Sequence, residues 1–335
     1  MSANLGHLPA TASSFTAFVG RQFTTPKPLP ANLDLSHQVA VITGANAGLG
    51  FESGRQLLRA NLAHLILAVR SRSRGDAAAQ TLRAEFPGAE ISVWLLDMLD
   101  YTSIKAFAER CAHAPRIDMV ILNAGLQKVP YTTAPETGHE VTIQVNYLST
   151  ALLSYLLIPV LKSHSQKPRE GNSRPIVLSV VGSDMMYSVE KINTDSPIIS
   201  AYDGEAAYEP QKMYAESKFL LCFFIERLSR TVEPGEVLIN MPNPGLTAGT
   251  SFFSARSAVV RTLARVGQAI LARSLEVSAT IYVDAATSCG PETHGSFLSE
   301  WAVAPFPPMW YTPQGKEFGE RLWNETLVEL DLAGH

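Results

Sequence analysis

The chain has 335 residues, of which 46% are hydrophobic and 17% are charged. This is enough apolar material for the core of one large α/β domain. A net charge of −4 gives no reason to expect a nucleic-acid partner. Three widely spaced cysteines and eight unclustered histidines suggest neither a disulfide framework nor a metal site. We therefore expect no metal and a reducing, cytoplasmic setting.

The first 36 residues are rich in Ser, Thr, Pro and Ala, and the stretch 25–30 contains three prolines. Such a stretch forms neither a helix nor a central strand. We interpret residues 1–36 as an arm that lies on a single domain spanning 37–330, with a disordered tail as the open alternative. The charged start and apolar run of a signal peptide are not visible here.

Residues 39–43 form a short apolar run of the kind found in buried parallel strands. Gly44, Gly48 and Gly50 follow, and an amphipathic stretch covers 51–60. Strand, glycine turn and helix in this order predict a phosphate site, because glycines allow close backbone approach and a helix N-terminus attracts anions. A glycine-rich turn without a ligand is the alternative.

The remaining chain alternates between the two kinds of element. We expect strands at 65–69, 91–96, 119–122, 176–181 and 237–241, and helices at 76–86, 103–112, 140–161 and 211–230. This alternation predicts a parallel sheet with helices on both faces, whose ligands bind at the carboxyl ends of the strands. The apolar stretch 146–161 is interrupted by polar residues and a proline, so we interpret it as a buried helix and expect no transmembrane segment.

Arg70 ends the second strand, about twenty positions beyond the glycine turn, where NAD enzymes usually carry an acid. An arginine there can pair with a 2′-phosphate, which favours NADP(H), and Arg72 and Arg74 could help. The alternative is a solvated basic turn. Asp97 ends the third strand, and we expect it to contact the ligand. The alternative is that Asp97 caps the next helix, although Asp100 or Thr102 could be the cap.

Tyr214 and Lys218 form a Y-x-x-x-K motif in the predicted helix 211–230. Residues four apart share a helix face, so the lysine cation lies near the phenol and is expected to lower its pKa. A tyrosine tuned in this way is a competent general acid and base. Asn146 is a polar amide within an apolar helix, which requires either a function or a local distortion that satisfies the amide.

Together these motifs resemble those of the short-chain dehydrogenase/reductase family over residues 35–303. The wider pattern, including 25–28, 67–70 and 290–295, is similar to fungal secondary-metabolite and retinol-dehydrogenase-like members. The resemblance implies a single Rossmann-type, doubly wound α/β domain. Its seven-stranded parallel sheet would be flanked by helices and end with a strand near 296–303.

The resemblance assigns a catalytic tetrad to Asn146, Ser183, Tyr214 and Lys218. Ser183 is chosen at the end of the fifth strand over Ser179, which should be buried mid-strand; a shifted strand end would remove the serine. The expected cofactor-binding residues are Thr43, Gly44, Asn46, Gly48, Leu49, Gly50, Arg70, Asp97, Met98, Asn123, Ala124, Gly125, Tyr214, Lys218, Pro244, Gly245 and Thr247. In the family, a Thr or Ser after Pro-Gly contacts the nicotinamide carboxamide. Here the corresponding position is Gly249, with Thr247 and Thr250 on either side, so we assign this contact to no residue.

The implied activity is NADP(H)-dependent reduction of a ketone, or oxidation of the alcohol, on a bulky hydrophobic secondary metabolite. An insertion at 184–210, carrying Met185, Met186, Tyr187 and Tyr202, and a lid-like apolar segment at 252–273 would define this small-molecule substrate. The alternatives are a non-redox cyclisation or isomerisation on the same fold, and a nucleotide-sensing protein. Apolar helices at 145–161 and 219–225 need cover on all sides, so a homodimer is possible.

Overall fold

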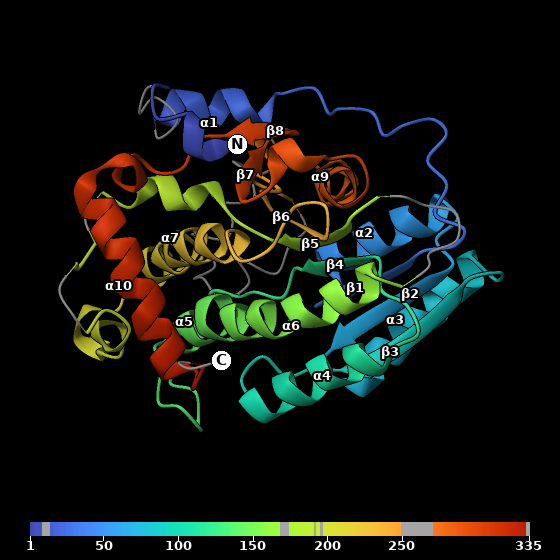
Figure 1. Ribbon diagram of the computed structural model, residues 1–335, viewed down its shortest axis with the longest axis horizontal. Helices are drawn as coiled ribbons and strands as arrows, with labels where there is room; N and C mark the ends of the chain where they lie inside the picture. The colour runs from blue at the N-terminus through green and yellow to red at the C-terminus, as the bar shows by residue number, and fades with distance from the viewer. Residues whose placement is uncertain (9–13, 168–173, 191, 195–196, 249–270, 333–335) are drawn as a thin grey trace.

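One eight-stranded sheet runs through the computed structural model, which describes residues 1–8, 14–167, 174–190, 192–194, 197–248 and 271–332 (Figure 1). The strand order is β3-β2-β1-β4-β5-β6-β7-β8, and all pairs are parallel except β7 with β8. The strands are β1 Val39–Thr43, β2 His64–Val69, β3 Glu90–Leu95, β4 Met119–Leu122, β5 Ile176–Val180, β6 Val237–Pro242, β7 Ser296–Ser299 and β8 Ala302–Ala304. The doubly wound α/β fold is thus confirmed, with its switch point between β1 and β4.

The last expected strand, 296–303, is in fact a hairpin. Glu300 and Trp301 between β7 and β8 both have positive φ, at 52° and 58°. Two such residues form the tight turn whose twist suits a hairpin. The sheet therefore has seven parallel strands, as expected, and one antiparallel edge strand that the sequence pattern did not reveal.

The helices follow the predicted alternation, with starts that lie up to four residues earlier than expected. They are α1 Phe15–Gln22, α2 Gly48–Arg59, α3 Arg72–Glu85, α4 Tyr101–His113, α5 Val141–Ile143, α6 Thr150–Ser165, α7 Pro210–Ser229, α9 Leu275–Thr287 and α10 Pro313–Glu329. A π-helical turn, Gln144–Ser149, joins α5 to α6. The predicted helix 140–161 is therefore continuous but distorted at its centre.

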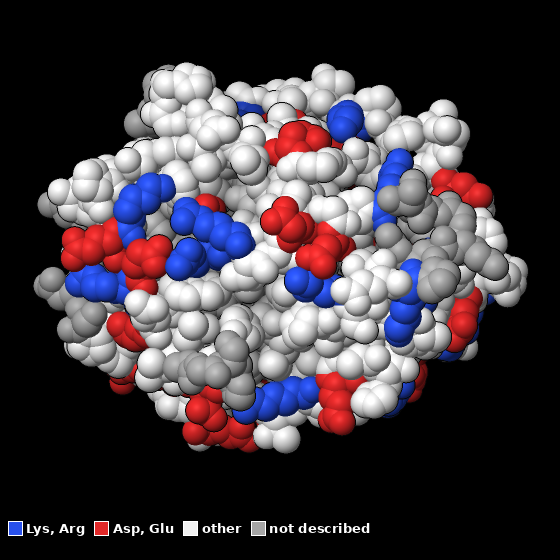
Figure 2. All heavy atoms as spheres, in the orientation of Figure 1, with Lys and Arg blue, Asp and Glu red and all other residues white. Residues whose placement is uncertain are grey.

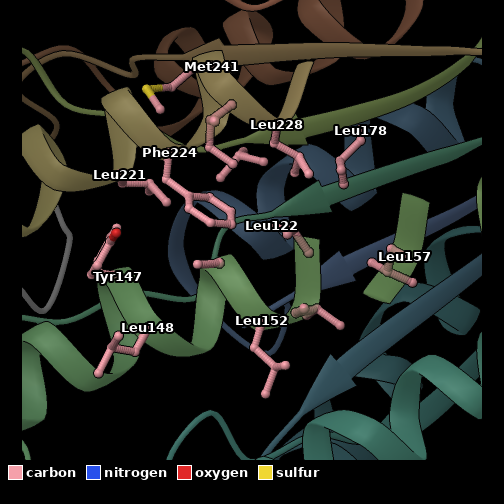
Figure 3. Packing of buried hydrophobic residues seen from close by; sticks show 14 of the residues in the cluster. Leu122, Tyr147, Leu148, Leu152, Leu157, Leu178, Leu221, Phe224, Leu228 and Met241 are labelled. Carbon is pink, nitrogen blue, oxygen red and sulfur yellow. The ribbon is translucent and has the colours of Figure 1, made fainter. Parts of the chain in front are cut away.

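Two hydrophobic cores lie on opposite faces of the sheet, because successive strand residues point to opposite sides. Val41 belongs to the core beneath α4, α6, α7 and α10, whereas Ala40 and Ile42 belong to the core beneath α2, α3 and α9. Figure 3 shows part of the first core, where Phe224 of α7 points toward Tyr147 and Leu152 belongs to α6.

By length and composition, Val141–Ser165 could cross a membrane, but 89% of its most apolar window is buried inside the protein. This is the behaviour of a core helix, as expected from its interrupted apolar pattern.

Helix α10 forms a further layer over α7. The Phe318 side chain is fully buried, with its ring centroid 5.3 Å from that of Phe223, and Trp323 stacks on Phe224 at 4.9 Å. This is the apolar face that we expected a second subunit to cover. A single chain does not test the homodimer, but the argument for it is removed, because the chain covers this face itself.

The described part of the N-terminal arm lies on the domain. Ser2 is buried beside the start of β7 and the end of β8. Its N–H donates to Ser296 Oγ at 3.0 Å, and its Oγ donates to the Ala304 carbonyl at 2.6 Å. Further along the arm, Lys27 Nζ lies 3.0 Å from the buried carboxylate of Asp284 on α9. Ser2 and Lys27 of the arm thus both contact the last third of the domain.

The described part of the insertion 184–210 contains three 3-10 turns, Asp184–Ser188, Ser200–Tyr202 and Glu205–Ala207, and packs onto α7 and α10. Met186, Tyr187 and Tyr202, three of the residues expected to line the substrate, are buried and pack in the first core. Glu325 of α10 accepts hydrogen bonds from the N–H groups of Ile198 and Ile199 at 2.9 and 2.7 Å. The lid-like segment 252–273 lies outside the described residues except for 271–273.

Charges of both signs are interspersed over the face shown in Figure 2. No single-sign patch dominates that face, in agreement with the small net charge.

We expect Phe318→Asp to expose the apolar face of α7, because a carboxylate cannot remain in a fully buried apolar contact. Light scattering should give a one-chain mass for the unmodified protein and larger species for Phe318→Asp. Val328→Asp is the matched control, since that residue lies on the same helix but is 69% exposed. A stable dimer mass for the unmodified chain would contradict self-covering.

Candidate functional site

The glycine turn after β1 folds tightly against the end of β4. Gly44 has φ of +66°, and a Cβ placed on it would lie 3.2 Å from the Ala124 backbone. A Cβ on Gly50 would lie 2.6 Å from the Asn123 side chain. The contact at Gly50 is closer than Cβ atoms show, so a side chain there would force a shift, and at Gly44 the positive φ would strain any other residue.

The N-terminus of α2 is suited to an anion. Its N-cap residue, Ala47, has no side chain to accept the first helical N–H groups. Gly48 has φ of +59°, and the space that a Cβ would occupy there is open to at least 4 Å. Asn46 and Leu49 are partly exposed beside it. Free N–H groups, a positive helix end and an open approach fit the pyrophosphate of a dinucleotide.

Two of the residues expected to bind cofactor also hold the backbone of the site together. Thr43 Oγ1 accepts the N–H of Ala124 at 2.9 Å, and Asn123 Nδ2 donates to the Thr43 carbonyl at 2.9 Å. These bonds tie the end of β1 to the end of β4. The side chains of Thr43 and Asn123 therefore shape the site, while Ala124 and Gly125 present small surfaces at the strand end.

Arg70 follows β2 directly, as expected, and is exposed. Within the described ranges its guanidinium has no acidic partner and makes no hydrogen bond, so it is available to a ligand phosphate. Arg72, in contrast, donates to the Val93 carbonyl at 2.8 Å.

Asp97 is not a helix cap, because Asp100 Oδ1 accepts the N–H groups of Thr102 and Ser103 at the start of α4. Asp97 Oδ1 accepts the N–H of Leu99 at 3.0 Å, in a turn just beyond β3. Met98, expected beside the cofactor, is buried, and its carbonyl accepts a hydrogen bond from Ser149 at 2.6 Å.

Three members of the expected tetrad come together beyond β5. Strand β5 ends at Val180, earlier than expected, yet the Ser183 side chain hydrogen-bonds the Tyr214 hydroxyl. Lys218 Nζ lies 6.0 Å from the centroid of the Tyr214 ring and donates to the Val181 carbonyl at 2.7 Å. The rival Ser179 is buried mid-strand, where it donates to Asn240 at 2.7 Å, and cannot reach the site.

The pKa of Tyr214 differs from our expectation. Burial raises it to about 12, and the hydrogen bond from Ser183 only partly opposes that rise. Burial also lowers the pKa of Lys218 to about 8. Desolvation penalises the charged form of each group more than their mutual attraction compensates at this separation. The phenol is therefore held protonated at neutral pH, not poised as a phenolate.

Asn146 lies in the π-helical turn with its amide fully engaged. Its Oδ1 accepts the Leu126 N–H at 2.8 Å, and its Nδ2 donates to the Leu126 carbonyl at 2.8 Å and to Ser217 Oγ at 3.1 Å. The helix is therefore distorted at Asn146 and the amide is satisfied by hydrogen bonds, which is the alternative that we gave to a functional role. It fastens Leu126, beyond β4, to Ser217, which directly precedes Lys218.

Pro244 and Gly245 follow β6, and Gly245 has φ of +70°. Thr247 is buried, and its hydroxyl donates to the Gly245 carbonyl at 3.1 Å and to Ser278 Oγ at 2.8 Å, so this side chain links the Pro-Gly turn to α9. Gly249 and Thr250 lie outside the described residues.

Sequence reasoning missed Asn243, which links three strand ends. Its Oδ1 accepts the N–H groups of Asp184 and Gly245, each at 3.2 Å, and its Nδ2 donates to Ser299 Oγ at 3.0 Å. Its position immediately before Pro-Gly was the one available signal. It also missed Arg21, whose guanidinium reaches Asp184 from the arm; nothing in the sequence joins two residues so far apart.

Among the described residues, two cavities of about 150 and 260 Å³ lie away from this chemistry. One is lined by residues of the insertion and of α7, including Tyr202 and Glu216. The other lies at the opposite edge of the sheet, near Asp118 and Cys289. The tetrad residues line neither, so the site is defined by its chemical groups and not by these hollows.

A doubly wound sheet with a glycine turn at its switch point, and a serine, tyrosine and lysine beyond β5, defines a nucleotide-dependent oxidoreductase class. The sequence profile of a family described as short chain dehydrogenase matches residues 38–188. The chain is 48% identical to the short chain dehydrogenase virL of Hypocrea virens (strain Gv29-8 / FGSC 10586), over 100% of this chain and 97% of that protein. The chain belongs to the short-chain dehydrogenase/reductase family.

Other relatives agree. The short chain dehydrogenase/reductase mfmJ of Annulohypoxylon moriforme is 41% identical over 97% of this chain and 94% of its own length. A putative NAD(P)-dependent gluconate 5-dehydrogenase from Beutenbergia cavernae, solved with NADP, shares the fold at a TM-score of 0.60 and 19% identity, covering 81% of this chain and 99% of its own. A short chain oxidoreductase from Pseudomonas aeruginosa PAO1 was solved with NADPH and is described as having an atypical catalytic centre. It shares the fold at a TM-score of 0.57 and 22% identity, covering 79% of this chain and 95% of its own.

We expect Lys218→Met to stabilise the folded protein at pH 7. The pKa of Lys218 falls from 10.5 in the unfolded chain to about 8 in the folded one, so the buried cation destabilises folding below pH 8 and this cost disappears toward pH 10.5. After allowing for the lost bond to Val181, the gain should be on the order of 2 kcal/mol.

Denaturant unfolding of both proteins at several pH values measures this difference. It should be largest at pH 7 and shrink between pH 8 and pH 10.5, whereas Lys212→Met, an exposed lysine on the same helix, should show no such trend. A difference that does not change with pH would contradict the lowered pKa.

Proposed function

We propose that this chain is an NADP(H)-dependent reductase that converts a ketone to an alcohol. The observation that carries the proposal is the contact of Ser183 with the Tyr214 hydroxyl, with Lys218 behind it, beyond the carboxyl end of β5. Parallel neighbouring strands bring this contact to the same edge of the sheet as the glycine turn.

The proposed cofactor contacts follow from the groups left open at that edge. The first N–H groups of α2 and the space at Gly48 would hold the pyrophosphate, and Arg70 would pair with the 2′-phosphate. Asp97 and the small residues Ala124 and Gly125 would border the adenosine. When bound, NADP(H) supplies the hydride in reduction or accepts it in oxidation.

The proposed proton chemistry belongs to the chain itself. Ser183 would donate a hydrogen bond to the substrate carbonyl oxygen, and Tyr214 would transfer its phenolic proton to that oxygen. Because burial raises the pKa of Tyr214 to about 12, the proton is present at neutral pH, which supports the reductive direction. Lys218 would stabilise the resulting phenolate, and Asn146 would support both by holding Ser217 in place.

We further propose a bulky hydrophobic ketone as substrate. The support is the apolar sequence of segment 252–273, which follows the Pro244–Gly245 turn in the chain. Thr247, two residues beyond that turn, and Arg273, the last residue of the segment, pair as a short parallel bridge.

Tyr214→Phe should lower kcat for ketone reduction by about 10²–10⁴-fold, because only the proton donor is lost. Consumption of NADPH with a panel of aromatic and terpenoid ketones, with products identified by mass, measures turnover. NADPH fluorescence should give a dissociation constant within about twofold of the unmodified protein. Full activity of Tyr214→Phe on the native substrate would remove the redox proposal and favour a non-redox cyclisation or isomerisation.

Arg70→Asp should weaken NADPH binding by about 10–100-fold, because it replaces a phosphate-pairing cation by an anion, and should change NADH binding far less. Isothermal titration with each cofactor tests this. Lys105→Asp, which makes the same charge change at an exposed position of α4, is the control. If the unmodified protein bound NADPH and NADH equally, Arg70 would not select the cofactor.

A further inference from the structure

Helix α1 of the arm contacts the loops that follow β5 and β6 (Figure 1). Arg21 Nη2 lies 3.2 Å from Asp184 Oδ2, in the loop after β5. Gln22 Oε1 accepts the N–H of Leu246 at 3.1 Å, in the turn after β6. One turn of one helix therefore joins two loops that carry expected site residues.

The contact with Asp184 is part of a buried group of four charges. Arg273 Nη2 donates to the Arg21 carbonyl and lies 3.5 Å from Glu300 Oε1, at the tip of the β7–β8 hairpin. The four side chains are at most 16% exposed and include two cations and two anions. Each buried charge is compensated by the others, so loss of one leaves its partner uncompensated.

This group of four charges contributes little to the stability of the fold. Burial raises the pKa values of Asp184 and Glu300, which the two arginines only oppose. Within the described part of the chain, the Nε and Nη1 atoms of Arg273 are buried without a hydrogen-bond acceptor. Networks with unpaired donors cost free energy, and a role in fixing geometry is the better explanation.

What the group fixes is the distance between two parts of the site. Asp184 directly follows Ser183, and its N–H donates to Asn243 Oδ1, the oxygen that also accepts the Gly245 N–H. Asn243 thus joins the serine loop to the Pro-Gly turn from inside the domain. Arg21 and Gln22 join the same two loops from outside.

We propose that α1 is a positioning element of the active site. Arg21, through Asp184, and Gln22, through Leu246, hold Ser183 at a fixed place relative to the Pro244–Gly245 turn. The inference rests on the proposed function for its effect on turnover, but the positioning itself can be measured without substrate.

The test compares Arg21→Met with Lys27→Met. Both remove a cation of the arm that pairs with a buried aspartate, but the partner of Lys27 is Asp284 on α9, away from the site. Arg21→Lys keeps the charge and serves as the conservative variant. Thermal melting establishes that each variant is folded.

Hydrogen exchange reports positioning directly. In Arg21→Met, the amides of Asp184 and Gly245 should exchange at least about tenfold faster than in the unmodified protein, with Lys27→Met unchanged. Unchanged protection in Arg21→Met, or an equal loss in Lys27→Met, would overturn the proposal.

Kinetics then separates positioning from stability. Arg21→Met should lower kcat by about tenfold or more while the NADPH dissociation constant stays within threefold, and Arg21→Lys should recover much of the loss. Equal kcat losses in Arg21→Met and Lys27→Met would also overturn it. If the unmodified protein turns over no ketone, the proposed function fails, and hydrogen exchange still decides the positioning.

Discussion

The close approach of two backbone segments at the switch point is the constraint on which the site depends. Gly44 and Gly50 allow the turn after β1 to rest against the end of β4, where a Cβ would lie 3.2 and 2.6 Å from its neighbours. Asn123 then fixes this approach through the Thr43 carbonyl. With the turn held there, α2 begins at the sheet edge with its N–H groups directed outward, and each later parallel strand adds its carboxyl end to the same edge.

The features that could be predicted from sequence depend on local spacing. Alternating apolar runs predicted six of the seven parallel strands, and the seventh followed from the family resemblance. The four-residue interval between Tyr214 and Lys218 predicted one helix face. The features that could not are long-range or energetic. Nothing local shows that α10 covers α7, or that Arg21 meets Asp184 across 163 positions. The pKa of Tyr214 was also wrongly predicted, because the sequence shows the neighbouring cation but not the extent of burial.

The region beyond β5 contains several polar and charged groups whose burial costs free energy. A buried lysine, a mostly buried phenol and four charged side chains that are at most 16% exposed lie within a few loops of one another. Burial opposes the charged forms of Lys218, Tyr214, Asp184 and Glu300 through their pKa values, so specific hydrogen bonds have a large part in holding this region in place. A hydride-transfer site benefits from such rigidity, because donor and acceptor must meet in a narrow range of geometry.

The fastening of Ser2 between β7 and β8 has a consequence for synthesis. Its partners, Ser296 and Ala304, lie 294 and 302 positions further along the chain. On the ribosome, Ser2 therefore waits until nearly the whole domain has been translated before it finds these native contacts. The glycine turn and the first strands can assemble earlier, whereas Ser2 can dock only after β8 has been made. The contacts of Arg273 and Glu300 near Ser183 also form late in synthesis.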